Sequence, residues 1–443
     1  MHRTKCTEMI NGVLAPYFLK KLVADVGDQR FSLLLDESTD LSVSKYLGVV
    51  IRCFSNTKQT IVSTFLGLVQ LEGGDARSIA QALVAFLEKC CLKKEKLLGI
   101  GTDNASVMTG NKNGVHKVLK DVYGIKDLVL IRCVNHSLQL AVTHASNDTL
   151  PSSVEYLVLG TWFSVSLKRR DAYKAIYETI NCGEQPLQIT KSVLGEVQLA
   201  IKAFEGEQVD PLKLLDSLVS LIKSAAELLL APEEKDQVRK RCVAFTISLT
   251  HELRLRLPDN IEALQYMSVF NVEKTLNHSK SLGEIEKIAK LLGYSPADID
   301  KIVQQWRSIH LRKWNETKNT VGFWVEVWKF RDTADNNPFH ELTMAAVSVL
   351  SLPHANAEVE RLFSQMSVVK SKLRNRMSLQ TLNSILYVRY GLKLSGDACY
   401  EHKLPDDVLQ LFGTSSAYSF KSAPSVAEPA IESLDQNDDM IFL

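Results

Sequence analysis

The sequence predicts an α/β fold whose sheet contains both antiparallel and parallel strands, and two observations support this prediction. Three runs rich in apolar and β-branched residues follow one another with short connections, at 31–36, 46–54 and 61–71, which is typical of an antiparallel meander. The pattern then alternates between helix and strand up to about residue 146. A meander followed by such alternation indicates a mixed sheet covered by helices.

Each remaining element follows from its own spacing. Apolar positions over residues 4–28 predict one or two helices, broken near Pro16. The helices expected after the meander lie at 75–93, 112–123 and 134–146, and the strands at 97–102 and 128–131. From about 150 to 335 the spacing is helical almost throughout. The clearest segments there are 212–231 and 259–307, and a last helical region covers 338–393.

Composition bounds the functions that the chain can have. A chain of 443 residues is expected to form two or three lobes. Its 52 basic and 51 acidic residues leave a net charge of +1, so any DNA affinity must come from local patches. The 8 cysteines lack framework spacing and are expected to be reduced thiols of an intracellular protein. No apolar stretch approaches the roughly 18–20 residues of a membrane span, so no membrane partner is expected.

Two acidic residues stand where an apolar run ends, Asp36 after the first expected strand and Asp103 after the fourth. In the expected topology the first strand is central and the fourth lies parallel beside it, so the two carboxylates should be adjacent. Such a pair repels unless a cation neutralises it, and hard oxygen ligands suit Mg²⁺ or Mn²⁺. The pattern is therefore a candidate site for metal-assisted phosphodiester cleavage.

The same two residues also fit a structural role. Aspartate commonly makes a turn or caps a helix in contexts such as LLDESTD and GTDNAS. The residue pattern alone leaves both interpretations open.

Five segments together resemble the hAT transposase family, namely FSLLLDESTDLS, GTDNASVMTG, RCVNHSLQLAV, TWFSVSLKRR and, most specifically, PHANAEVERLFSQMSVVKSKLRNRMS. The resemblance covers about residues 3–395. It implies a ribonuclease-H-like catalytic domain, interrupted by a long helical insertion, with a triad of metal-binding acids. The catalytic and metal-binding positions of this chain are then Asp36, Asp103 and Glu360, with Mg²⁺ or Mn²⁺ as the cofactor of an intact site.

The resemblance also implies domain boundaries. The expected parts are N-terminal helices over 1–29, the first part of the ribonuclease-H-like core over 30–150, a helical insertion over 151–337, returning helices with the dimerisation region over 338–395, and an acidic tail over 396–443 that is disordered from about 412. The chain starts directly at RTKCTEMI, so the family's upstream zinc finger is expected to be absent. A block of the insertion is expected to be missing near 189–191.

A Cys-x-x-His pair of the family corresponds to Cys133 and His136 at the last strand-to-helix junction. Zinc sites normally use four ligands, and His144 has no evident way to join these two. A structural or DNA-proximal role is therefore favoured, and no zinc is expected.

Two basic clusters are candidate DNA contacts. The first is Trp162 with Lys168, Arg169 and Arg170, and the second is Lys370, Lys372, Arg374 and Arg376. An exposed aromatic ring can stack on a base, and cations can follow the phosphate backbone. The alternatives are a core tryptophan beside a solvated charge run, and a solvated helix C-terminus.

The last two predicted helices carry apolar faces at helical spacing. In the family this region packs against a partner subunit as well as against its own chain. The residues expected in a homodimer or larger assembly are Leu362, Phe363, Leu382, Ile385 and Leu386. Intramolecular packing is the alternative, and the two are compatible.

The resemblance leaves several functions open. In the first, the chain is a transposase-derived protein of the nucleus, and also of the cytoplasm, that is catalytically weak or inactive and acts through homodimerisation and contacts with double-stranded DNA or chromatin. In the second, it is a Mg²⁺-dependent transposase or nuclease that cuts and joins DNA strands. Catalysis needs acids held to fractions of an ångström, which three acids in a sequence do not guarantee. A protein-only scaffold is the third hypothesis.

Overall fold

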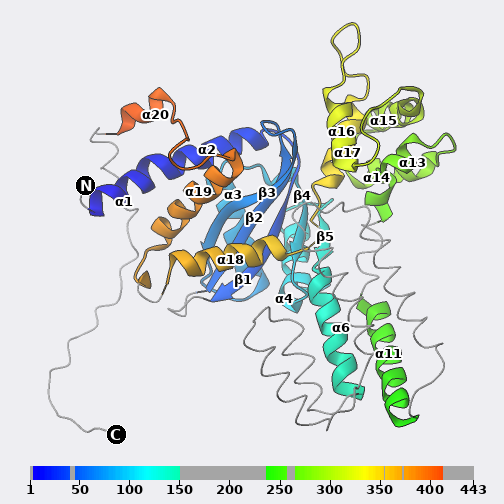
Figure 1. The fold of residues 1–443 in the computed structure, drawn as a ribbon, viewed down its shortest axis with the longest axis horizontal. Helices are drawn as coiled ribbons and strands as arrows, with labels where there is room; N and C mark the ends of the chain where they lie inside the picture. Colours follow the sequence, from blue (N-terminus) through cyan, green and yellow to red (C-terminus); the bar gives the residue numbers. More distant parts are fainter. Residues whose placement is uncertain are drawn as a thin grey trace, which may run out of the picture.

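The computed structural model describes residues 3–39, 45–149, 236–256, 265–353, 355–371 and 374–412 (Figure 1). A five-stranded sheet in the order β3-β2-β1-β4-β5 forms its centre. The strands are β1 Phe31–Thr39, β2 Lys45–Ser55, β3 Thr60–Gln70, β4 Leu97–Thr102 and β5 Val129–Arg132. The first three strands pair antiparallel, and β4 and β5 join them in parallel. The predicted mixed sheet, with the first strand at its centre, is confirmed.

The central strand β1 is buried on both sides. Leu33 and Leu35 face one hydrophobic cluster, whereas Leu34 faces another, because successive side chains of a strand point to opposite faces. The strand does not end at Asp36, as the sequence pattern had predicted. It continues to Thr39 because β2 pairs with it as far as Lys45.

Helices cover both faces of the sheet (Figure 1). On one face, the cluster around Leu33 includes residues of α2 Ala15–Val26, α3 Ala76–Lys89 and α5 Val115–Asp121. On the other face, α18 Ala357–Val369 and α19 Leu379–Ser395 pack against β1, β2 and β3. The two ends of the described chain therefore enclose one sheet.

The N-terminal segment is helical from α1 Arg3–Met9 to the end of α2, and the predicted break near Pro16 is wrong. Pro16 lies in the first turn of α2, where its missing N–H does no harm. A π-helical turn, Ile10–Leu14, precedes it and keeps the path continuous.

The described part of the middle region is helical, as predicted. Its helices, together with the two that flank it, are α6 Val134–Thr149, α11 Asp236–Arg256, α13 Val272–Leu276, α14 Leu282–Leu291, α15 Pro296–Ser308, α16 Thr320–Lys329 and α17 His340–Leu350. They share one core with Trp306, Trp314 and Trp324. The described part of 259–307 is a series of short helices separated by loops, because Asn271 and Ser295 cap new helix starts.

Several predicted features lie outside the described residues. They are the helix at 212–231, the missing block near 189–191 and the tail after 412. Two further short helices are α4 Ser106–Thr109 and α20 Asp406–Leu411. No helix in the described ranges is long and apolar enough to cross a membrane.

Candidate functional site

The half-buried carboxyl of Asp36 lies in the central strand, beneath helix α18. Its partner on β2 is Gly48. A Cβ atom at Gly48 would lie 2.8 Å from Cζ of Phe363 on α18, so the glycine is what allows the helix to approach the sheet this closely. The local sequence of β2 thus determines how near α18 comes to Asp36.

Asp103 follows β4 directly. Leu34 on β1 is opposite Gly101 on β4, so Asp36 and Asp103 follow at corresponding positions of neighbouring parallel strands. The Oδ1 atom of Asp103 also accepts a hydrogen bond from the N–H of Ala105, at 3.2 Å. Asp103 therefore both makes a turn and lies beside Asp36, so the two interpretations of its sequence context are compatible.

Glu360 lies in the first turn of α18 and is exposed. The buried side chain of Asn356 connects the start of this helix to the sheet, because its Nδ2 donates to the carbonyl oxygen of Leu35 at 3.2 Å. The carbonyl oxygen of Asn356 in turn accepts the amide of Glu360 at 3.3 Å. One asparagine thus connects the residue before Asp36 to the helix that carries Glu360.

The three acids share one electrostatic environment. The pKa of Asp36 is raised from 3.8 to about 7, first by burial and then by the charge of Asp103, with a further increase from Glu360. A hydrogen bond from the backbone N–H of Glu37, at 2.9 Å, opposes this increase in the pKa. Like charges raise a pKa most strongly at short range, so Asp103 and, to a smaller extent, Glu360 lie near enough to Asp36 to raise its pKa.

These acids supply the donor type that Mg²⁺ or Mn²⁺ prefers, namely carboxylate oxygens. Asp36 and Asp103 can act as a pair, whereas the side chain of Glu360 is exposed. In the part of the chain that the structure describes, no group of three or more His, Cys, Asp or Glu side chains is arranged to hold a metal ion. The donor chemistry therefore fits a divalent cation, and the third ligand is not in place.

Cys133 stands at the junction between β5 and α6 and is buried. Its amide donates to the carbonyl oxygen of Thr102 at 2.8 Å. Burial raises the pKa of its thiol, and the backbone N–H groups of His136 and Asn356 oppose this rise by hydrogen bonding. The thiol thus lies at the N-terminus of α6 and close to α18, whereas His144 is exposed on the same helix.

The second basic cluster does not form one exposed surface. Lys370 is buried, with its Nζ 5.5 Å from the ring centroid of Tyr46 and 3.5 Å from its hydroxyl oxygen. Contact with a DNA backbone requires an exposed ammonium group, so the expectation for Lys370 is corrected. Arg374 and Arg376 are exposed. The remaining candidates lie outside the described residues: Lys372, Trp162, Lys168, Arg169 and Arg170.

The residues expected in the dimer contact are packed within their own chain. Leu362, Leu382 and Leu386 have no exposed surface and belong to the cluster on the α18–α19 face of the sheet. Phe363 and Ile385 are partly buried against the same cluster. The first three side chains therefore support these helices from beneath and do not reach the surface of the chain.

Three further polar residues near Asp36 and Asp103 were not predicted from the sequence: Asn104, Asn356 and Glu37. Asn104 donates through Nδ2 to Oγ of Ser137 at 2.8 Å, and the Oδ1 atoms of Asn104 and Asn356 are buried without a hydrogen-bond partner in the described protein. The pKa of Glu37 is raised by burial, although Lys45 lowers it, and Asp103 raises it further. The only signal in the sequence was that each of the three residues lies within one of the segments that resemble the hAT family.

Two regions of the chain match known families. Residues 5–114 match the ZMYM1/FAM200 RNase-like domain, which includes β1 to β4 and both Asp36 and Asp103. Residues 311–392 match the hAT family C-terminal dimerisation region, which includes α18 and most of α19. The two matches cover the two parts of the chain that meet around Asp36.

Proposed function

We propose that this hAT-family transposase-derived protein, identified by its RNase-like domain and its hAT dimerisation region, acts through self-association and contact with double-stranded DNA. Cleavage of DNA strands is weak or absent in this proposal. The observation that carries it is the match of residues 311–392 to a dimerisation region. Its site of action is the nucleus, with a cytoplasmic fraction.

The arrangement of the acids supports a weak or inactive catalytic site. Two-metal cleavage needs carboxylates that converge on the ions, and small displacements remove most of the rate. Glu360 is exposed, and the described residues contain no three-ligand group. Self-association depends instead on the outer surface of the helices that cover the sheet.

Val368 is the residue we choose to test that surface. It lies on α18 within the matched region, and its side chain is 64% exposed. Val122, at the end of α5 on the opposite side of the sheet, is 65% exposed and serves as a matched control. A glutamate at either position leaves the core untouched, because neither side chain is buried.

We expect the wild-type protein to show twice the 49.6 kDa mass of one chain in light scattering at micromolar concentration. Val368→Glu should raise the dissociation constant by about tenfold or more, which corresponds to about 1.4 kcal/mol. Val122→Glu should leave the dissociation constant unchanged. A monomeric mass for the wild-type protein would contradict the proposal.

Strand cleavage is the second candidate, and one observation favours it. The pKa of Asp36 is raised to about 7 by burial and by neighbouring acids, and a divalent cation would relieve that repulsion. Asp36 and Asp103 would hold Mg²⁺ or Mn²⁺, with Glu360 as the third ligand after its side chain turns inward. A bound ion would activate water and stabilise the leaving oxygen.

One assay with duplex DNA separates the two candidates. Under our proposal the protein shifts the duplex in a gel without nicking it, in the presence of Mg²⁺. Replacing both exposed arginines, Arg374→Ala and Arg376→Ala, should reduce the slope of log affinity against log salt by about 2. Mg²⁺-dependent nicking that Asp103→Ala abolishes would instead establish the second candidate. Absence of any duplex binding at low salt would leave only a protein scaffold.

A further inference from the structure

The edge strand β3 is covered along only half of its length. Over Leu66 and Leu68 the helix α19 supplies its hydrogen bonds. The side chain of Asn383 accepts from the Leu68 N–H at 2.8 Å and donates to its carbonyl oxygen at 2.9 Å. The hydroxyl of Tyr387 donates to the carbonyl oxygen of Leu66 at 2.7 Å. This half of the edge is therefore closed to another strand.

The other half, Thr60–Thr64, has no such cover on its backbone, and its residues are partly exposed except Thr64, which is buried. Its backbone pairs with β2 on one side, and among the described residues no helix or loop hydrogen-bonds to its backbone on the other side. Unpaired backbone groups on a strand edge are a ready template for an added strand. Native proteins usually cover such an edge, as α19 does for the neighbouring half.

A groove of about 650 Å³ runs along this open half and is lined by all five residues from Thr60 to Thr64. Val321 and Val325 of α16 form one wall, and Tyr390 of α19 lies on another. The groove has room for an extended backbone between the two helices. Its walls limit the approach of a second folded domain, so a single extended segment suits it best.

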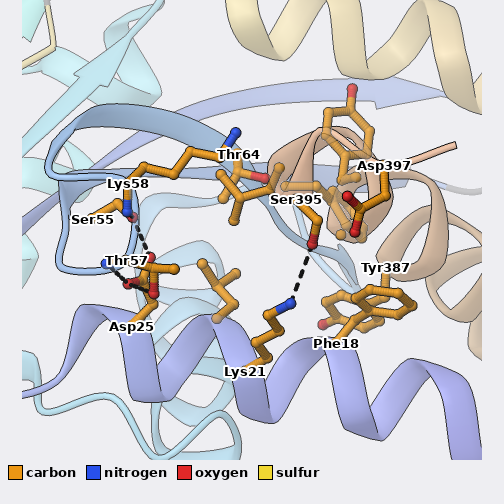
Figure 2. A pocket seen from close by; sticks show the side chains of 15 residues that line it. Phe18, Lys21, Asp25, Ser55, Thr57, Lys58, Thr64, Tyr387, Ser395 and Asp397 are labelled. Atoms are coloured by element: carbon orange, nitrogen blue, oxygen red, sulfur yellow. Dashed lines mark hydrogen bonds between the residues drawn. The ribbon is translucent and has the colours of Figure 1, made fainter. Parts of the chain in front are cut away.

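The groove leads into a pocket of about 370 Å³ between α2 and α19 (Figure 2). Four residues line both spaces, namely Lys58, Thr64, Tyr390 and Leu394. Figure 2 shows Phe18 and Tyr387 on one side of the pocket, and the hydrogen bond between Lys21 and Ser395 across it. Its aromatic lining suits one bulky apolar side chain at the end of an extended segment.

The charges of the groove favour an acidic occupant. Lys58, Lys393 and Arg52 line it, against one acid, Glu358. That acid is already paired with Arg361, at 2.8 Å. The guanidinium of Arg52 contributes its charge only, because its donors are bonded to Ser63, Leu350 and Leu352. In the adjoining pocket, Asp25 accepts hydrogen bonds from Ser55 and Thr57. Its carboxylate therefore faces the turn between β2 and β3.

We propose that an extended acidic peptide segment of a partner protein adds to the sheet as a sixth strand along Thr60–Thr64. Its backbone pairs with the open edge, its acids face Lys58 and Lys393, and one apolar side chain enters the pocket between α2 and α19. Backbone pairing supplies the affinity in this mode of recognition, and the side chains supply the specificity.

The test uses the full chain and the synthetic peptide FETEVETE, with FKTKVKTK as its basic counterpart. We expect the acidic peptide to bind and to slow hydrogen exchange of backbone amides within Thr60–Thr64, whereas the basic peptide does neither. Replacing both lysines, Lys58→Glu and Lys393→Glu, should weaken binding by about tenfold or more. Lys126→Glu, which changes an exposed lysine near β5 at the opposite edge, should have no effect.

A chemical variant of the peptide isolates the backbone contribution. N-methylation of alternate residues removes the N–H groups of one edge of the peptide without changing its charge. Methylating either the odd-numbered or the even-numbered residues should abolish binding, whichever set faces β3, and methylating the other set should not. The proposal is overturned if FETEVETE does not bind at about 1 mM, or if it binds without protecting the Thr60–Thr64 amides. A further outcome is that a single-stranded oligonucleotide displaces the peptide and leaves those amides unprotected. That result would show that the groove binds nucleic acid and would contradict the proposal.

Discussion

Asp36 carries a conflict between folding and electrostatics. It lies in the central strand, where the three preceding residues, Leu33 to Leu35, are buried and apolar, and its pKa is raised to about 7 by burial and by Asp103. Residues that oppose the local folding preference in this way tend to occur at functional sites. The raised pKa makes the stability of the protein depend on the protonation of this one carboxyl.

The sign of that dependence follows from proton linkage. Because the pKa of Asp36 is about 7 in the folded chain and 3.8 when exposed, the native state holds the extra proton between those values. The free energy of unfolding should therefore fall as pH rises from about 4 to about 7. Asp36→Asn cannot ionise, so above pH 7 it should be more stable than the wild type by about 2–4 kcal/mol.

Urea unfolding at several pH values checks this expectation. The two proteins should have nearly equal stability at about pH 4, and their curves should separate as the wild-type carboxyl ionises. Curves that stay parallel from about pH 4 to pH 8 would show that Asp36 is not perturbed in the folded state.

Lys370 illustrates what a sequence cannot decide about a single residue. It belongs to a run of basic residues after α18, and such runs are usually solvated. Its ammonium group instead lies against the ring of Tyr46, a residue of β2. Only the packing of α18 onto the sheet determines that this member of the run is buried while Arg374 and Arg376 are exposed.

At the scale of elements, an arginine joins a strand to the end of a helix. Arg52 of β2 donates to the carbonyl oxygens of Leu350 and Leu352 at the C-terminal end of α17, at 3.3 and 3.2 Å, and to Oγ of Ser63 at 3.0 Å. Burial lowers the pKa of its guanidinium to about 10, against a raising influence from Glu358, so the group stays charged at neutral pH. It supplies donors where a helix leaves its last carbonyls unpaired.

Replacing this arginine should therefore destabilise the junction between the sheet and α17. Arg52→Met keeps much of the side-chain volume but leaves the carbonyls of Leu350 and Leu352 without these donors, and the free energy of unfolding should fall by about 2–4 kcal/mol. Arg52→Lys should lose less, because one donor group remains. Chemical unfolding measures both variants, and a loss below about 0.5 kcal/mol for Arg52→Met would contradict the role.

The positions of most elements could be predicted because their apolar residues recur with the period of a strand or a helix. The surfaces against which α18 and α19 pack could not be predicted in this way. Apolar faces at helical spacing fit a partner subunit and the chain's own sheet equally well, and Leu362, Leu382 and Leu386 turn out to cover the sheet. Periodicity shows which face of a helix is buried, and it carries no information about what buries it.

At the scale of the whole molecule, two distant parts of the chain build one unit. The RNase-like match ends at residue 114 and the dimerisation match begins at residue 311, and contacts such as Asn356 to Leu35 and Tyr387 to Leu66 join them. Self-association through α18 and strand addition at β3 would thus use different surfaces of the same unit. The first depends on side chains of one helix, and the second on the backbone of an edge strand.

The sequence by itself determined the central place of the first strand with the fourth parallel beside it, the helical character of the described part of the middle region and the neighbouring positions of Asp36 and Asp103, because strand periodicity and the rules of strand connection act locally. Tertiary structure decided the rest. It placed the carboxyl of Glu360 near the pair but exposed, buried Lys370, and left half of β3 open. These outcomes depend on how closely α18 and α19 pack on the sheet. Contacts between residues several hundred positions apart in the sequence determine that packing.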